Sequence, residues 1–258
     1  MADNLFEIKN LSFSYDKDNV IDDLSLTIKP GGVTTIIGAN GCGKSTLFNL
    51  MTKNLKYDKG EIKFLGEDIS KIKLRALAKK LAIVHQQNTI PFDITVEKLV
   101  GYGRIPYENL CIPSKQEDNE DKIIWAMSVT GVYDIKGELL SRLSGGQRQR
   151  AWIAMSLAQD TDTLLLDEPT TFLDIKHQIE ILKLIENLNK EHGISIIMVL
   201  HDMNQAMRYS TEVIALKDGK NIAQGSPESV IIEELLKKLY GVDLDIVEVN
   251  GKPFVYMA

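Results

Sequence analysis

The segment that most constrains this chain is residues 38–45, which read Gly-Ala-Asn-Gly-Cys-Gly-Lys-Ser and fit the pattern G-x-x-x-x-G-K-[ST]. It follows a short apolar run at residues 33–37, typical of a buried strand, and it opens a segment with helical periodicity. Glycines in such a loop let backbone N–H groups converge on phosphate oxygens, and the helix N-terminus adds partial positive charge. The segment therefore predicts a loop that binds the phosphates of a nucleotide.

The last two residues of this phosphate loop have separate expected roles. Lys44 is placed to reach the β and γ phosphates, and the Ser45 hydroxyl is placed to coordinate Mg²⁺. ATP and Mg²⁺ are therefore the expected ligands. The expected nucleotide contacts in and just after the loop are Gly38, Ala39, Asn40, Gly41, Cys42, Gly43, Lys44, Ser45 and Thr46.

Two adjacent carboxylates, Asp167 and Glu168, end another apolar run at residues 163–166. Because neighbouring side chains on a strand point to opposite faces, the two acids can have different roles. We expect Asp167 to engage Mg²⁺ through its water shell, since Mg²⁺ dehydrates reluctantly, and Glu168 to polarise the attacking water as general base. The alternative is that the two acids only cap a following helix. The phosphate loop upstream favours the role in ATP hydrolysis.

A third motif, Ser144-Gly145-Gly146-Gln147, precedes a clear helical pattern. Ser144 and Gln147 have the spacing of a capping box, in which each side chain bonds the backbone N–H of the other. The same segment is a glycine-flanked helix N-terminus, and therefore a second candidate anion site. Since the chain already has one phosphate loop, a second site makes sense if it serves the ATP of another chain. Both interpretations can hold together.

Short apolar runs alternate with helical segments along most of the chain, which predicts an α/β fold with a mostly parallel core sheet. Residues 6–28 instead alternate between apolar and polar side chains and predict an antiparallel β subdomain. A Gly/Pro-punctuated loop at 101–106 and an acidic helical stretch at 115–130 predict a helical subdomain. The tail shows a helix start at Ser226-Pro227 and a hairpin around Asn250-Gly251.

These elements predict one domain, 1–258, with three parts. The first is a nucleotide-binding core with the antiparallel β lobe, at about 1–90 and 160–225. The second, at about 91–159, is a helical lobe that carries the Ser-Gly-Gly-Gln motif, and the third, at about 226–258, is a C-terminal helix and hairpin.

Composition excludes some classes of partner. The formal net charge is -6 and basic residues are scattered among acidic ones, so nucleic acid is not an expected partner. Cys42 lies inside the phosphate loop, where a disulfide to Cys111 would hinder nucleotide entry, and reduced thiols fit a cytosolic protein. No stretch approaches the roughly 18 apolar residues of a membrane span. Any transport would therefore need a membrane partner.

In these motifs and their order the sequence resembles the ABC ATPase family over nearly its whole length. The order is the phosphate loop, Gln86 after the second core strand, Leu-Ser-Gly-Gly-Gln, Asp167-Glu168, and His201 at a later strand end. The resemblance implies the P-loop NTPase fold of ABC ATPases. It also implies that Gln86 senses Mg²⁺ and the attacking water, and that His201 contacts the γ-phosphate.

The same resemblance implies a sandwich of two copies of the chain. Each ATP would lie between the phosphate loop of one copy and the segment from Ser144 to Gln147 of the other. Tyr15 aligns with the aromatic residue that stacks on adenine, although an ordinary strand aromatic is the alternative. The turn Phe172-Leu173-Asp174 would cross the dimer interface.

Three segments resemble importer ATPases for iron–siderophore, haem and cobalamin uptake: residues 94–104, 171–178 and 236–242. The resemblance implies an integral membrane permease, which docks at about residues 88–106, and, indirectly, a substrate-binding protein. It places the chain at the cytoplasmic face of the membrane as a peripheral subunit that is soluble when isolated. The alternatives are another ABC transporter, such as a metal-ion importer or an exporter, and a non-transport ABC ATPase.

Overall fold

The computed structural model describes residues 3–16, 18–86, 88, 93–108, 116–249 and 252–256. The chain forms two compact units. The first combines Met1–Ile72 with Ser195–Ala258, and the second is Lys73–Ile194.

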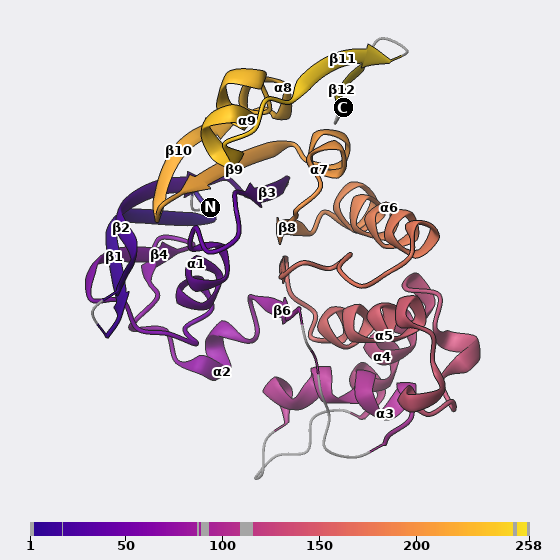
Figure 1. The fold of residues 1–258 in the computed structure, drawn as a ribbon. Coiled ribbons are helices and arrows are strands. Elements are labelled where there is room, and N and C mark those ends of the chain that lie inside the picture. Colours follow the sequence, from indigo (N-terminus) through magenta and orange to yellow (C-terminus); the bar gives the residue numbers. More distant parts are fainter. Residues whose placement is uncertain are drawn as a thin grey trace. The chain divides into compact units, whose positions relative to one another are not determined.

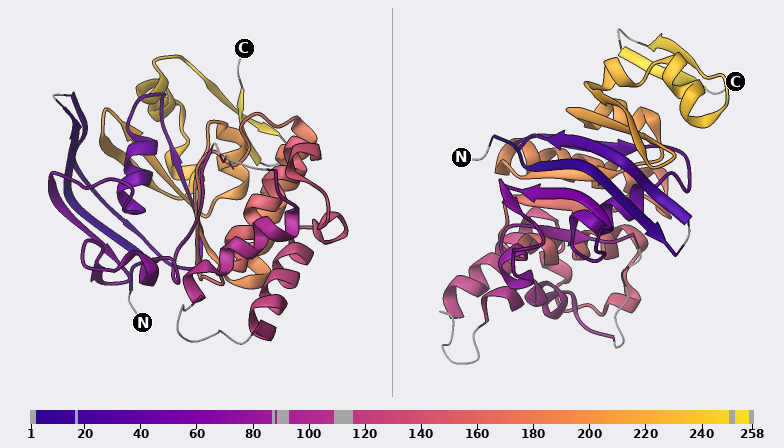
Figure 2. Two further views of the ribbon diagram at one scale, coloured as in Figure 1. Left: turned by 90° about the horizontal axis from the view of Figure 1, so that it is seen from below. Right: turned by 90° about the vertical axis from the view of Figure 1, so that its left-hand side faces the viewer.

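In the first unit, an antiparallel sheet has the strand order β2-β1-β4-β5. Its strands are β1 (Phe6–Tyr15), β2 (Asp18–Ile28), β4 (Lys59–Phe64) and β5 (Glu67–Asp68). Phe6 pairs with Ile28 on one side and with Phe64 on the other, and all three side chains are fully buried. Figures 1 and 2 show β1 and β2 as long neighbouring strands. The alternating pattern of the N-terminal sequence therefore forms the predicted antiparallel subdomain.

The first unit also contains parallel strands. β3 (Val33–Ile37) lies between β8 (Ser195–Val199) and β9 (Glu212–Lys217) and runs parallel to both. β10 (Lys220–Gly225) pairs with β9 in the antiparallel direction. Every residue of β3 and β8 is buried, as expected for apolar runs without alternation.

Helices of the first unit begin where the sequence signals place them. α1 (Lys44–Met51) follows the phosphate loop, and α8 (Pro227–Val230) has proline at its first position. α7 (Met203–Tyr209) follows β8, and α9 (Glu233–Tyr240) leads to a hairpin of β11 (Asp245–Val249) and β12 (Lys252–Tyr256). The pairing of β11 with β12 confirms the predicted hairpin, whose turn residues Asn250 and Gly251 lie outside the described residues.

In the second unit, β6 (Ala82–Val84) runs parallel to β7 (Thr163–Leu166). The helices α3, α4 and α5 pack against one another. The unit's helices and short helical turns are α2 (Leu74–Leu77), α3 (Val96–Gly101), η1 (Tyr102–Tyr107), α4 (Gln116–Val129), η2 (Tyr133–Ile135), η3 (Leu140–Arg142), α5 (Gly145–Ala158) and α6 (Ile175–His192).

The expected loop at 101–106 is instead the end of α3 followed by the 3₁₀ helix η1. Arg104 explains why this segment is helical. It is buried, and its guanidinium donates to the Ala158 carbonyl (2.7 Å) and to Asn119 Oδ1 (2.9 Å). The contact closes the C-terminus of α5, whose last carbonyls need donors. Glycine and proline suggested a loop, but tertiary hydrogen bonds order the segment. Within the described residues, the helices are too short or too polar to cross a membrane.

Candidate functional site

The phosphate loop of the first unit has the strand–loop–helix context that its sequence predicts. β3 leads into it, and α1 begins at Lys44. Gly43, directly before α1, has φ 105°, a conformation that side chains disfavour. A Cβ at this position would also lie 2.9 Å from Ile21 Cδ1 and 3.0 Å from the Val20 carbonyl oxygen. Glycine is therefore required here both by the backbone conformation and by the available space.

Lys44 folds back over this loop. Its Nζ donates to the carbonyls of Gly38 (2.8 Å) and Ala39 (3.0 Å), and only 5% of the residue is exposed. A buried ammonium held by neutral carbonyls is poised for an anion, because phosphate oxygens are stronger acceptors for a charged donor. Ser45 is exposed at the start of α1, where its hydroxyl is accessible.

Cys42 lies within the loop with 6% of its surface exposed. Burial raises the pKa of its thiol, and the neighbouring charge of Lys44 partly opposes that rise. The thiol is therefore protonated at neutral pH and acts as an apolar packing group beneath the loop.

Tyr15 and His201 also belong to the first unit. Tyr15 ends β1 with 48% of its surface exposed, and Phe13 meets its ring edge-on at a centroid distance of 4.8 Å. An exposed ring of this kind offers a face for stacking on a base. His201 is exposed in the short connection between β8 and α7. Asp202, the next residue, caps α7 by accepting from the N–H groups of Asn204 (2.7 Å) and Gln205 (3.0 Å).

In the second unit, the structure brings Gln86 and Glu168 into direct contact. Gln86 follows β6, and its Nε2 donates to Glu168 Oε2. Thr171 Oγ1 donates to the same carboxylate oxygen at 3.0 Å. The two residues that sequence reasoning linked to the attacking water thus lie side by side. Thr171 was missed as a partner of this carboxylate, although its position three residues after Glu168 could have suggested it.

Asp167 and Glu168 were expected to point to opposite faces of a strand. The structure separates them differently, because the strand ends before them. β7 ends at Leu166, and the Asp167 N–H extends the pairing by donating to the Val84 carbonyl at 2.9 Å. Glu168 has φ 49°, so the backbone turns there into the left-handed region. Asp167 is buried and Glu168 is half-buried. A non-glycine residue at positive φ costs on the order of 1 kcal/mol or more, and such strain is found at functional sites.

Ser144 forms the predicted capping box at the start of α5. The Gln147 N–H donates to Ser144 Oγ (3.2 Å), and the Ser144 N–H donates to Gln147 Oε1 (3.0 Å). Gly146 is needed for space, and Gly145 has little room for a side chain, because Leu173 and His177 lie against these two positions. A Cβ on Gly145 would lie 3.2 Å from Leu173 Cδ2, and one on Gly146 would lie 2.6 Å from His177 Cγ.

Asp174 holds His177, the residue that lies against Gly146, by hydrogen bonds. Asp174 caps α6: the His177 N–H donates to its Oδ1 (2.9 Å), and His177 Nδ1 lies 2.8 Å from its Oδ2. Both hydrogen bonds lower the pKa of the Asp174 carboxyl. The bond from the His177 backbone N–H has the larger effect, and the bond from the His177 side chain has the next largest. The expected interface residue Asp174 and the Ser144 motif are therefore joined through His177. Sequence analysis did not predict this link, although the spacing of three between Asp174 and His177 was an available signal.

The candidate residues divide between the two units. The first holds the phosphate loop, Tyr15 and His201. The second holds Gln86, Asp167, Glu168, Asp174 and the motif from Ser144 to Gln147.

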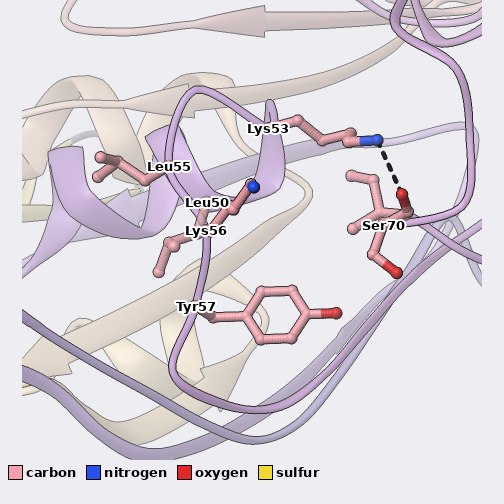
Figure 3. Close-up of a pocket in the computed structure, with 7 residues that line it drawn as sticks. Leu50, Lys53, Leu55, Lys56, Tyr57 and Ser70 are labelled. Carbon is pink, nitrogen blue, oxygen red and sulfur yellow. Dashed lines mark hydrogen bonds between the residues drawn. The ribbon is translucent and has the colours of Figure 1, made fainter.

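A cavity of about 370 Å³ also lies in the first unit, at the C-terminal end of α1. Lys53 reaches across it, and Figure 3 shows its ammonium directed at Ser70, with the Tyr57 ring facing the same space. Lys53 Nζ donates to the carbonyls of Ser70 (3.1 Å) and Ile72 (2.6 Å). The cation thus ties the loop after β5 to the end of α1, which is a structural role. The lining residues are Leu50, Lys53, Leu55, Lys56, Tyr57, Ile69 and Ser70.

Comparison with known sequences gives consistent matches. Residues 21–171 match the family model described as ABC transporter. The petrobactin import ATP-binding protein FpuC of Bacillus anthracis is 43% identical over 250 residues, which cover 97% of this chain and 92% of that protein. The ferric enterobactin transport ATP-binding protein FepC of Escherichia coli is 43% identical over 249 residues, with coverage of 96% and 92%.

Solved structures agree with these matches. An inward-facing metal-chelate type ABC transporter contains a chain that superposes with a TM-score of 0.84 at 25% identity, covering 98% of this chain and 96% of that one. A dimeric ATP-binding cassette bound to ADP and Pi superposes with a TM-score of 0.74 at 28% identity, covering 86% and 98%.

Proposed function

Because this chain belongs to the ABC transporter family as an ATP-hydrolysing subunit, we propose that it drives the import of an iron chelate through a separate membrane permease. The observation that carries the ATPase part is the Gln86–Glu168 contact directly after two parallel strands, in a chain whose phosphate loop holds a buried lysine. Its relatives along nearly the full length are named for petrobactin and ferric enterobactin transport, which supports a ferric siderophore as the cargo. Haem and cobalamin are the other cargoes of the same class.

The candidate site residues of both units have roles in this proposal. Backbone N–H groups of the phosphate loop and Lys44 bind the phosphates and stabilise charge as the γ-phosphoryl group transfers. Glu168 accepts a proton from the attacking water, which Gln86 helps to orient. His201 contacts the γ-phosphate, and Tyr15 stacks on adenine. The positive φ of Glu168 aims its carboxylate at Gln86 and Thr171, so the base is oriented before the nucleotide arrives.

Each unit offers oxygen donors that suit Mg²⁺. Ser45 offers an exposed hydroxyl, Asp167 a buried carboxylate and Gln86 an amide oxygen, and hard oxygen ligands are those that Mg²⁺ prefers. When bound, the ion neutralises charge on the β and γ phosphates. In this proposal Ser45 and Asp167 hold it, directly or through water.

The working form is a dimer of two copies. An ATP-binding cassette of similar fold is dimeric with ADP and Pi, which supports this arrangement. In the proposal, each nucleotide also contacts the Ser144 motif of the other copy. The Ser144 hydroxyl and the N-terminus of α5 then face the γ-phosphate. Asp174 lies at the interface between the copies.

The permease is proposed to dock at residues 88–106 and the neighbouring α2. Within the described part of this region, Tyr102 and Ile105 expose large apolar side chains, with 56% of Ile105 accessible. Leu74 of α2 is 67% exposed, and Arg75 Nε donates to the Pro106 carbonyl at 2.8 Å, so α2 lies beside η1. An exposed apolar patch of this kind is typical of a protein interface. In this proposal the chain lies at the cytoplasmic face of the membrane, and a substrate-binding protein acts on the other side.

Uptake of radioactive iron bound to a siderophore tests the cargo. Cells that lack the gene for this chain should lose uptake, and the wild-type gene should restore it while Glu168→Gln should not. Unchanged iron uptake together with lost uptake of zinc or manganese would instead identify a metal-ion importer.

A further inference from the structure

The helix that follows His201 is too short to hold its own position. α7 has seven residues, and an isolated helix of this length is unstable in water. Its placement depends on tertiary contacts, which include the buried side chains of Met203, Ala206 and Tyr209. His201 lies just before the cap of this helix. At its other side, the Leu200 N–H donates to the Ile36 carbonyl at 3.3 Å. Any shift of the first turn of α7 therefore moves His201.

Asn204 fixes that first turn to the C-terminal hairpin. Its Nδ2 donates to the Val255 carbonyl (3.1 Å), and its Oδ1 accepts from the Val255 N–H (2.8 Å). One side-chain amide thus satisfies both backbone groups of a strand residue, as a neighbouring strand would. Val255 is 2% exposed, whereas Phe254 and Tyr256 on either side of it are 43% and 49% exposed. Val255 is therefore the residue of β12 through which these hydrogen bonds hold the hairpin to α7.

Further contacts hold the hairpin and α9 in place. Tyr240, the last residue of α9, donates its hydroxyl to Met203 Sδ at 3.6 Å. Burial raises the pKa of Tyr240 to about 12, so the hydroxyl stays protonated. Glu233 Oε1 accepts from the Ile246 N–H (3.0 Å), and Lys217 Nζ donates to the Lys238 carbonyl (2.6 Å). The hairpin is thus tied to α9, and α9 to the end of β9.

We propose that Asn204 is a positioning residue for His201: its paired hydrogen bonds to Val255 make the C-terminal hairpin the support that sets the γ-phosphate histidine. The hairpin is then part of the ATPase mechanism although none of its residues touches the nucleotide. The inference rests on the proposed role of His201. Figure 1 shows β12 next to α7, in agreement with the two hydrogen bonds.

ATP hydrolysis by the full chain tests this role. Asn204→Ala should lower kcat about tenfold, because His201 is held less well in the geometry that the reaction needs, with little change in KM for ATP. Asn204→Asp keeps the size and the acceptor but sets a carboxylate against the Val255 carbonyl, so it should lower kcat at least as much. Asn221→Ala is the matched control, because the Asn221 amide also donates to a backbone carbonyl, that of Ser25 at 3.3 Å, but Asn221 lies on β10 and not on α7. It should leave kcat unchanged.

A double-mutant cycle separates positioning from a general loss of structure. If Asn204 acts through His201, then adding Asn204→Ala to His201→Ala should change kcat less than twofold, because the group being positioned is already gone. A factor of ten in both backgrounds, or a wild-type kcat for Asn204→Ala and Asn204→Asp, overturns the inference and leaves the proposed ATPase intact. A wild-type rate for His201→Ala overturns the proposed role of His201 itself.

Discussion

Replacing Gly146 by alanine is expected to destabilise the second unit, although alanine is the better helix former. Gly146 lies in the first turn of α5, where a Cβ would lie 2.6 Å from Cγ and 3.0 Å from Cβ of His177. The ring cannot move away at little cost, because Nδ1 lies 2.8 Å from Asp174 Oδ2 and the backbone N–H is bound to the same carboxylate. The new methyl group must therefore displace His177 or the start of α5.

Two opposing terms set the magnitude. Alanine gains up to about 1 kcal/mol over glycine in a helix. Overpacking a filled site costs about 1–3 kcal/mol. With the full gain of alanine, the difference predicts a net loss of up to about 2 kcal/mol, equivalent to a fall in Tm of up to about 8 °C for a protein of this size. The ATPase rate should fall as well, because the Ser144 motif moves with the helix start.

Thermal unfolding followed by circular dichroism measures this change. Gly101→Ala is the matched control, since Gly101 is also helical and the nearest atom to its Cβ position is Ile123 Cδ1 at 3.9 Å. It should melt at or above the wild-type temperature. Removing the ring should relieve the clash, so Gly146→Ala should be neutral or stabilising in a His177→Ala background. A Gly146→Ala protein that melts at or above the wild-type temperature would refute the steric argument.

The other predictions concern the nucleotide. Lys44→Ala should lower ATP turnover by at least about 100-fold in a phosphate-release assay, and a normal rate would contradict the loop assignment. Glu168→Gln should bind ATP, hydrolyse it about 100- to 1000-fold more slowly, and accumulate as a dimer in size-exclusion chromatography. A near-normal rate would show that Glu168 is not the base. ATP should protect Cys42 from iodoacetamide. Because burial raises the pKa of Cys42, its alkylation rate should level off at a higher pH than that of a free cysteine; a plateau at the same or a lower pH would contradict this.

Local sequence determined the elements that carry the site. The spacing of glycine and lysine specified the loop between β3 and α1. Positive φ values and the start of a helix depend on residues that are close in the sequence, so a local pattern can predict them. The spacing of Ser144 and Gln147 specified their capping box for the same reason. Apolar runs without alternation specified the buried strands. These features need no knowledge of what lies across the fold.

Tertiary structure alone decided which distant side chains meet. Gln86 and Glu168 are 82 positions apart, and the parallel pairing of β6 with β7 brings them together. Asn204 and Val255 are 51 positions apart, and no local pattern predicts that one amide would satisfy both backbone groups of a strand residue. Such contacts depend on how whole elements pack, because a side chain's partners are set by space and not by spacing along the chain. The sequence thus identified the candidate ATP-binding groups, and packing determined which of them lie in contact.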